Sequence, residues 1–429
     1  MKRVATACLV GSTIEYYDFF IYGTAAALVF PTVFFPHLSP AMAMTASMGT
    51  FAAAFLSRPL GAVVFGYFGD RLGRKKTLVA TLLIMALSTV MAGLVPSTAT
   101  IGEAAPLILI ALRLLQGVAL GGEWAGSALL SAEYAPAAKR GRYSMFTPLG
   151  SPTAGVLASL TFLGVNYTIG EHSPAFMQWG WRVPFLISAV LIGIGLYVRL
   201  HIDETPVFAE QKARNSVPNA PLAELLRVQH REVALAAGSV LAGFTFGFMA
   251  GTYLTTYANT HLGYARNTVL VVGVLGGLAY MAFIALSAAL CDRFGRRRMM
   301  LIGWAACLPW SFVVIPLMDT GKPICYAVAT VGIHTATGTG LGPVAAFIPE
   351  LFATRYRYSG TALALNLAGV AGGPTPLIAG TLQATYGSWA IGLMLAAIAL
   401  VSLVCTLRLP ETNGTTLRSI PGADTSVAS

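Results

Sequence analysis

Five ionisable side chains interrupt apolar runs in the first third of the sequence: Glu15, Asp18, Arg58, Arg113 and Glu123. Burial favours the neutral form of a carboxyl group, whereas a neighbouring guanidinium favours its ionised form, so an acid beside an arginine can take up and release a proton. Arginine also binds carboxylates through two parallel hydrogen bonds. These residue types therefore suit proton transfer and the binding of an anionic solute.

The spacing of these residues predicts where they lie on their helices. Glu15 and Asp18 are i, i+3 and share a face, and Tyr22 lies four residues after Asp18 on that face. Counted at a rise of about 1.5 Å per residue from the ends near Val4, Gly69 and Glu133, which are expected to be cytoplasmic, Glu15, Arg58 and Glu123 lie about 15–17 Å in, close to the midplane. Asp18 and Arg113 lie about 21 and 30 Å from the same ends and so reach toward the outside.

The composition identifies the solvent around these helices. Hydrophobic residues make up 56% of the 429 residues and charged residues only 10%, compared with about 25% charged residues in soluble proteins. This excludes a water-soluble globular protein and predicts a membrane protein, in which a charge at the helix centre costs about 2.5–3.5 kcal/mol and is functional by default. The five cysteines lie far apart, so neither a metal site nor a disulfide framework is expected.

The apolar runs predict an all-α integral membrane protein with twelve transmembrane helices in two pseudo-symmetric six-helix lobes. The predicted domains are an N-terminal lobe (1–201), a cytoplasmic linker (202–232), a C-terminal lobe (233–409) and a flexible tail (410–429). The predicted helices are 4–30, 45–68, 77–95, 107–133, 143–167, 182–201, 233–258, 266–290, 299–318, 323–349, 358–383 and 387–408.

The basic residues predict the orientation. If the N-terminus is cytoplasmic, 22 of the 27 lysines and arginines fall in cytoplasmic segments and three in external ones. This asymmetry follows the positive-inside rule, so both termini are expected in the cytoplasm of a cell whose inner membrane the chain spans.

Three sequence echoes indicate that a six-helix unit is duplicated. Gly69–Lys76 recurs as Cys291–Arg298 at an offset of 222, Glu133 recurs as Glu350 at 217, and Glu204-Thr205 recurs as Glu411-Thr412 at 207. Such a repeat is typical of a two-lobed transporter whose substrate site lies between the lobes.

The repeated Asp-Arg-x-Gly-Arg loop resembles the signature of the major facilitator superfamily. More narrowly, Glu15–Gly23, Ser57–Gly61 and Arg113–Gly117 followed by Gly121-Gly122-Glu123 resemble the metabolite:proton symporter family. That family includes carriers of α-ketoglutarate, citrate, shikimate, proline and betaine. Tyr16 is a departure, because members commonly have Trp there.

The resemblance implies roles for the intramembrane residues. It makes Asp18 the main proton carrier and Arg113 its counter-charge, as in other proton symporters with an acid on the first helix and an arginine on the fourth. We expect Arg58 to hold a substrate carboxylate, with Glu15 and Glu123 as its resting counter-ions and as further proton-coupling groups. The alternative is that some of these residues form permanent buried ion pairs. Further candidate substrate-binding residues are Arg113, Tyr17, Tyr22, Tyr253 and His334.

The resemblance also implies a latch of ion pairs at the cytoplasmic rim, which forms when the lobes close there and breaks when they part. Asp70 and Asp292 are expected to meet helix N-termini and arginines, and Glu133 and Glu350 to pair with loop arginines. The predicted gate consists of Asp70, Arg71, Arg74, Glu133, Asp292, Arg293, Arg296 and Glu350.

We therefore expect a secondary active transporter that takes up a small organic acid with protons, and a di- or tricarboxylate in particular. The alternatives are a proton symporter of a zwitterion such as proline or betaine, and a proton-coupled export antiporter. No nucleophile, metal cluster or nucleotide motif indicates an enzyme or an ATP-driven pump. We expect no cofactor and no nucleic-acid partner; the expected partners are the solute, protons and lipid, and the expected state is a monomer.

Overall fold

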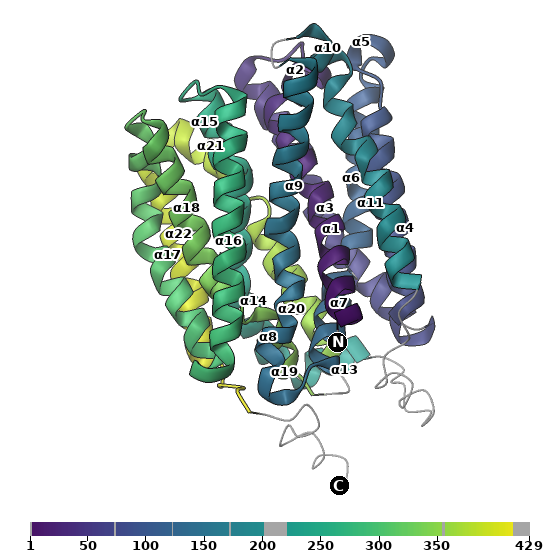
Figure 1. The fold of residues 1–429 in the computed structure, drawn as a ribbon, viewed down its shortest axis with the longest axis vertical. Coiled ribbons are helices and arrows are strands. Elements are labelled where there is room, and N and C mark those ends of the chain that lie inside the picture. Colours follow the sequence, from purple (N-terminus) through teal and green to yellow (C-terminus); the bar gives the residue numbers. More distant parts are fainter. Residues whose placement is uncertain are drawn as a thin grey trace.

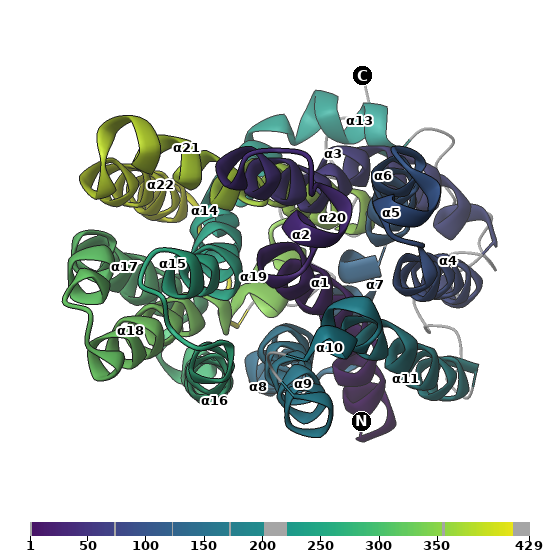
Figure 2. The ribbon, with the colours of Figure 1, turned by 90° about the horizontal axis from the view of Figure 1, so that it is seen from above.

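The computed structural model describes residues 2–72, 74–121, 123–170, 173–200, 221–353 and 357–414, and these contain helices and no strands. Figure 1 shows long helices that run side by side along the molecule. α1 begins and α22 ends at the same end of this bundle, which we call the termini end. Seen from above in Figure 2, the purple-to-blue helices of the first half of the chain, which form one lobe, lie beside the green-to-yellow helices of the second half, which form the other.

The first lobe holds the helices up to α11. They are α1 (Lys2–Leu28), α2 (Phe30–Phe34), α3 (Pro40–Leu72), α4 (Arg74–Leu94), α5 (Thr98–Ile101), α6 (Ala104–Leu120), α7 (Glu123–Tyr134), α8 (Arg140–Ser144), α9 (Phe146–Ile169), α10 (Pro174–Gln178) and α11 (Val183–Leu200), with 3-10 turns at Ala137–Lys139 and Gly180–Arg182.

The second lobe holds the helices from α14 onward. They are α14 (His230–Phe248), the π-helical turn η3 (Met249–Tyr253), α15 (Leu254–Thr260), α16 (Arg266–Phe294), α17 (Arg296–Asp319), α18 (Pro323–Leu341), α19 (Val344–Glu350), α20 (Arg357–Gly372), α21 (Thr375–Tyr386) and α22 (Ser388–Arg408).

The twelve predicted spans are present. Within the described residues, ten helical segments are long and apolar enough to cross a membrane. The other two spans are α1, whose apolar run contains Glu15 and Asp18, and α18 continued by α19; both lie alongside the ten in Figure 1.

Several predicted spans are interrupted rather than continuous. The predicted helix 107–133 is divided into α6 and α7 at Gly121, 323–349 into α18 and α19, and 358–383 into α20 and α21 at Gly373-Pro374. The span 233–258 contains η3. Proline and glycine interrupt the hydrogen bonding of a helix and leave backbone groups without their helical partners. A membrane protein tolerates this where neighbouring protein covers those groups.

The connection between the lobes falls partly on residues 201–220, which lie outside the described residues. The described part of the predicted linker contains α13 (Pro221–Val228), which packs against α14 and α20. Of the predicted tail, residues 415–429 lie outside the description.

Candidate functional site

Asp18 lies inside the first lobe and is buried, with 2% of its surface exposed. Its Oδ2 accepts a hydrogen bond from the Thr89 hydroxyl of α4 at 2.6 Å, and its Oδ1 accepts one from the Ser188 hydroxyl of α11 at 3.0 Å. Three helices of the lobe, α1, α4 and α11, thus position this carboxyl group.

Gln116 connects this cluster to Arg113 on α6. The Gln116 amide donates to Thr89 Oγ1 at 2.5 Å, and its oxygen accepts from Arg113 Nη1 at 2.7 Å. Arg113 and Asp18, predicted as a charge pair, are therefore joined through two intervening side chains. We call Arg113, Gln116, Thr89 and Asp18 the buried polar chain; every donor in it points toward Asp18.

Aromatic rings surround the other faces of the Arg113 guanidinium, which is fully buried. Its carbon lies 4.0 Å from the ring centroid of Tyr22, 4.7 Å from that of Phe19 and 5.5 Å from that of Phe51. Cation–π contacts of this kind stabilise a cation that has lost its water. The Tyr22 hydroxyl donates to Thr50 at 2.8 Å, so Tyr22 supports the arginine within the lobe.

Arg58 reaches across the interface between the lobes. Its Nε donates to Asn366 Oδ1 of α20 at 3.3 Å, and the Asn366 amide donates to the Gly121 carbonyl at 2.8 Å. The guanidinium carbon lies 6.0 Å from the ring centroid of Phe244. Arg58 is therefore part of an interlobe contact, 3% exposed, and does not line the cavities described next.

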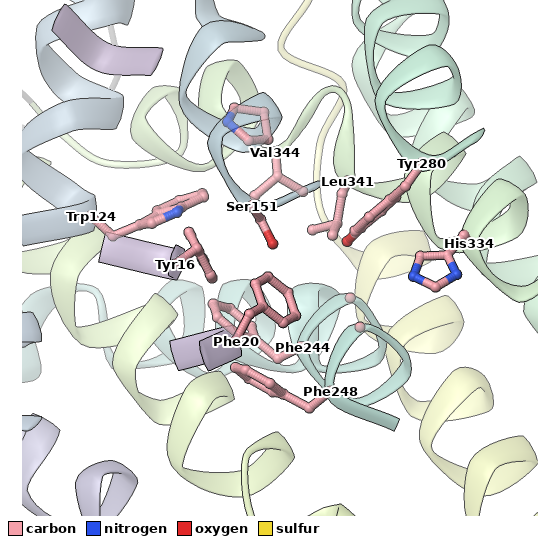
Figure 3. Close-up of a pocket in the computed structure, with 13 residues that line it drawn as sticks. Tyr16, Phe20, Trp124, Ser151, Phe244, Phe248, Tyr280, His334, Leu341 and Val344 are labelled. Carbon is pink, nitrogen blue, oxygen red and sulfur yellow. The ribbon is translucent and has the colours of Figure 1, made fainter. Parts of the chain in front are cut away.

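Two small cavities, each of about 50 Å³, lie between the lobes and share Phe20, Tyr280 and His334. Figure 3 shows the first, with Tyr16, Trp124 and Ser151 from one lobe and Phe244, Tyr280 and His334 from the other. No Asp, Glu, Lys or Arg is among the residues that line either cavity, all of which are described.

The cavity walls contain residues that sequence reasoning missed. Tyr16 and Trp124 were not predicted as site residues, although each is next to an intramembrane glutamate, Glu15 and Glu123. Adjacency to such a charge was an available signal. Glu15 and Glu123 are themselves buried, on α1 and on the first turn of α7, and these two helices pack together.

The predicted tyrosines lie elsewhere. The Tyr17 hydroxyl lies 3.2 Å from both Thr161 and the Pro184 carbonyl, inside the first lobe. The Tyr253 hydroxyl donates to Gln383 within the second lobe. Among the predicted substrate-binding residues, only His334 lines the central cavities as the structure describes them.

A larger cavity of about 960 Å³ lies at the end opposite the termini end. Helices α2, α3, α15 and α21 and the last turn of α1 line it, so both lobes contribute. On the other side of this end the lobes touch, because Asn166 of α9 donates to Asn267 of α16 at 3.0 Å. The opening therefore lies on the side of α1 and α3.

At the termini end, an ion pair and hydrogen bonds connect the two lobes. Arg140 Nη1 lies 2.5 Å from Glu350 Oε1, and Arg296 Nη1 lies 2.9 Å from Glu350 Oε2. Asp292 accepts hydrogen bonds from the backbone N–H groups of Gly141 at 2.8 Å and Arg142 at 3.0 Å. We call Arg140, Glu350, Arg296 and Asp292 the gate cluster.

The gate cluster contains three of the predicted gate residues, and Arg140 was missed because it was counted only as a topology signal. Arg293 is exposed and lies over the Phe294 ring at 5.5 Å. Glu133 lies on α7, half-buried. The side chains of Asp70, Arg71 and Arg74 lie outside the described residues. Glu411, which accepts from the N–H groups of Arg296 and Arg297 at 2.9 and 3.1 Å, was also not predicted.

Comparison with known proteins places this geometry in a family. The sequence pattern of the Major Facilitator Superfamily matches residues 8–374. The chain is 42% identical to the Inner membrane metabolite transport protein YhjE of Escherichia coli (strain K12), over 96% of this chain and 94% of that one. It is 36% identical to the Shikimate transporter of the same organism, over 96% and 94%.

The fold is likewise that of a solved transporter. The proton:xylose symporter XylE, bound to 6-bromo-6-deoxy-D-glucose, superposes with a TM-score of 0.76 at 19% identity and covers 97% of each chain. One relative is named an inner-membrane metabolite transport protein and the other a transporter, and neither is named an enzyme, in agreement with the predicted resemblance. The chain belongs to the Major Facilitator Superfamily.

Proposed function

We propose that the protein takes up a small organic acid together with protons by alternating access, with its termini end in the cytoplasm. The observation that carries proton coupling is the buried polar chain, which links an acid to an arginine inside one lobe. A carboxyl group buried within a membrane span costs free energy, and such a residue is therefore read as functional by default.

The buried polar chain supplies a means of coupling. Every donor in the chain points toward Asp18, so the Thr89 hydroxyl donates to the ionised carboxylate. When Asp18 takes up a proton it becomes a donor itself, which favours a Thr89 hydroxyl that accepts, and the negative charge that Arg113 faces is lost. Arg113 lies against Phe19 and Phe51, and both of these rings contact Phe248 of the other lobe, with centroids 6.2 Å apart. Protonation is thereby linked to a surface where the lobes meet.

The central cavities favour a solute with one carboxylate. A di- or tricarboxylate, the expectation from the sequence, needs several cationic partners, and the residues lining the described cavities include none. Arg58 lies behind Phe244, where it suits one carboxylate once that ring moves. A zwitterion is the second candidate, because aromatic walls stabilise an ammonium group through cation–π contacts. No observation on the described residues favours export by antiport.

The test is internal pH, measured with a trapped dye in proteoliposomes of the full chain. Mono-, di- and tricarboxylates and zwitterions are added outside in turn, with protein-free liposomes as the control for passive permeation of the neutral acid. We expect acidification with a monocarboxylate or zwitterion. Acidification only with di- or tricarboxylates would overturn the solute assignment, and alkalinisation on solute addition would indicate antiport.

A further inference from the structure

His334 occupies the centre of the interface between the lobes. It lies on α18, lines both central cavities and contacts Tyr280 edge-on, with ring centroids 5.2 Å apart. Figure 3 shows its ring next to Tyr280, whose hydroxyl group lies between His334 and the Ser151 hydroxyl of the other lobe in this view.

One ring nitrogen of His334 is committed to its own helix. Nδ1 lies 2.7 Å from the Thr330 carbonyl oxygen. A carbonyl oxygen has no proton to give, so Nδ1 carries the proton and donates it. In a neutral imidazole, the other nitrogen, Nε2, is then an acceptor.

The neutral form is the one that suits this place. An imidazolium buried without a counter-ion costs several kcal/mol, and no carboxylate lines either described cavity. Nε2 has no hydrogen-bond partner among the described residues. The cavity therefore presents an acceptor lone pair that nothing described in the protein satisfies.

We infer that His334 Nε2 accepts a hydrogen bond from the transported solute, which must bring a hydroxyl or N–H donor in addition to its carboxylate. This inference rests on the proposed function and adds a selection rule to it. A solute held by His334 of the second lobe and by Ser151 of the first bridges the lobes. Solutes that lack a donor leave the acceptor unpaired.

Matched solute pairs test the rule on the unaltered protein. Uptake of shikimate is compared with uptake of cyclohex-1-ene carboxylate, and uptake of proline with uptake of N,N-dimethylproline, in the pH-dye assay. We expect the member with donors to be preferred at least about tenfold in each pair that is transported, because a buried polar group left unpaired is discriminated strongly. Equal uptake within the pairs would overturn the inference and leave the proposed function standing. No coupled uptake of any solute would overturn both.

Two variants then assign the preference to His334. His334→Phe keeps a ring of similar size beside Tyr280 but removes the acceptor, whereas His334→Gln restores one. We expect the Phe variant to raise KM for the solute with donors about tenfold or more, with little change for its donor-less analogue, and the Gln variant to recover most of the preference. If His334 served only in packing, the Phe variant would change KM equally for both solutes. An unchanged preference in the Phe variant would contradict the assignment. If the Phe variant does not fold, loss of preference in a His334→Leu variant gives the same decision.

Discussion

Asp18 is the residue on which proton coupling depends in this proposal. It is buried, and two hydroxyl groups donate to its two oxygens. Asn has the same size but carries no exchangeable carboxyl proton, so Asp18→Asn should abolish accumulation against a gradient and spare exchange of labelled solute. Both are measured in proteoliposomes, as gradient-driven uptake and as counterflow.

The control for that variant is Asp319→Asn. Asp319 is an exposed carboxylate at the end of α17 that bonds the Tyr257 hydroxyl, far from the buried polar chain. We expect full accumulation from it. Full accumulation by Asp18→Asn as well would remove Asp18 from the mechanism.

Gln116 tests whether the connection to Arg113 matters beyond the acid itself. Gln116→Leu keeps the volume but removes both hydrogen bonds, which leaves a buried arginine donor unpaired at a cost of about 1–3 kcal/mol. We expect accumulation to fall about tenfold while counterflow persists. Gln178→Leu, on the exposed side of α10, is the matched control and should transport normally. Equal accumulation by the two variants would show that Arg113 acts without this link.

The charged residues of the first lobe could be predicted from the sequence, but the uncharged polar residues that they contact could not. The buried charges of the first lobe were predictable because a charge in an apolar run is conspicuous. Thr89, Gln116 and Ser188 were not, because uncharged polar residues are common in membrane helices and only the tertiary structure shows what they bond. The contact between Arg58 and Asn366, 308 positions apart, has no sequence signal either.

Helices α3 and α6 show how closely elements of this fold approach. A Cβ atom added at Gly61 of α3 would lie 1.9 Å from the Val118 carbonyl oxygen of α6. Such approaches are typical of small residues between membrane helices. The predicted spans succeeded here because hydropathy determines which segments cross the membrane; their interruptions, at Gly121 and Gly373-Pro374, depend on how neighbouring helices cover the freed backbone.

Gly61→Ala should therefore destabilise the first lobe, because one of the two backbones must move. Overpacking of this kind typically costs about 1–3 kcal/mol. We expect a lower thermal unfolding midpoint in detergent. Gly49→Ala on the same helix is the control: a Cβ there meets nothing within 4 Å, so only the higher helix propensity of Ala acts. If both variants melt at the same temperature, the contact between α3 and α6 is looser than described.

On the scale of the whole molecule, the lobes are held together at one end by charge and separated at the other by a cavity. The gate cluster buries Glu350 between Arg140 and Arg296, whose side chains are 5% and 0% exposed. At the opposite end, the cavity of about 960 Å³ is lined by both lobes. In the proposed orientation, this arrangement is that of a carrier closed toward the cytoplasm, and we propose that the gate cluster is the interaction that must break for solute release.

Glu350→Gln should shift the protein toward the state open at the termini end. Neutralising Glu350 removes the carboxylate that the buried guanidinium groups of Arg140 and Arg296 share. Removing one partner of a buried ion pair costs about 3–5 kcal/mol, which is comparable to the few kcal/mol that separate two conformations. Spin labels at Lys139→Cys and Arg298→Cys, exposed positions on different lobes, report the separation when the native cysteines are replaced. We expect a longer distance in Glu350→Gln, and an unchanged one in Glu103→Gln, an exposed carboxylate at the far end. An unchanged distance in Glu350→Gln would mean that packing rather than charge keeps this end closed.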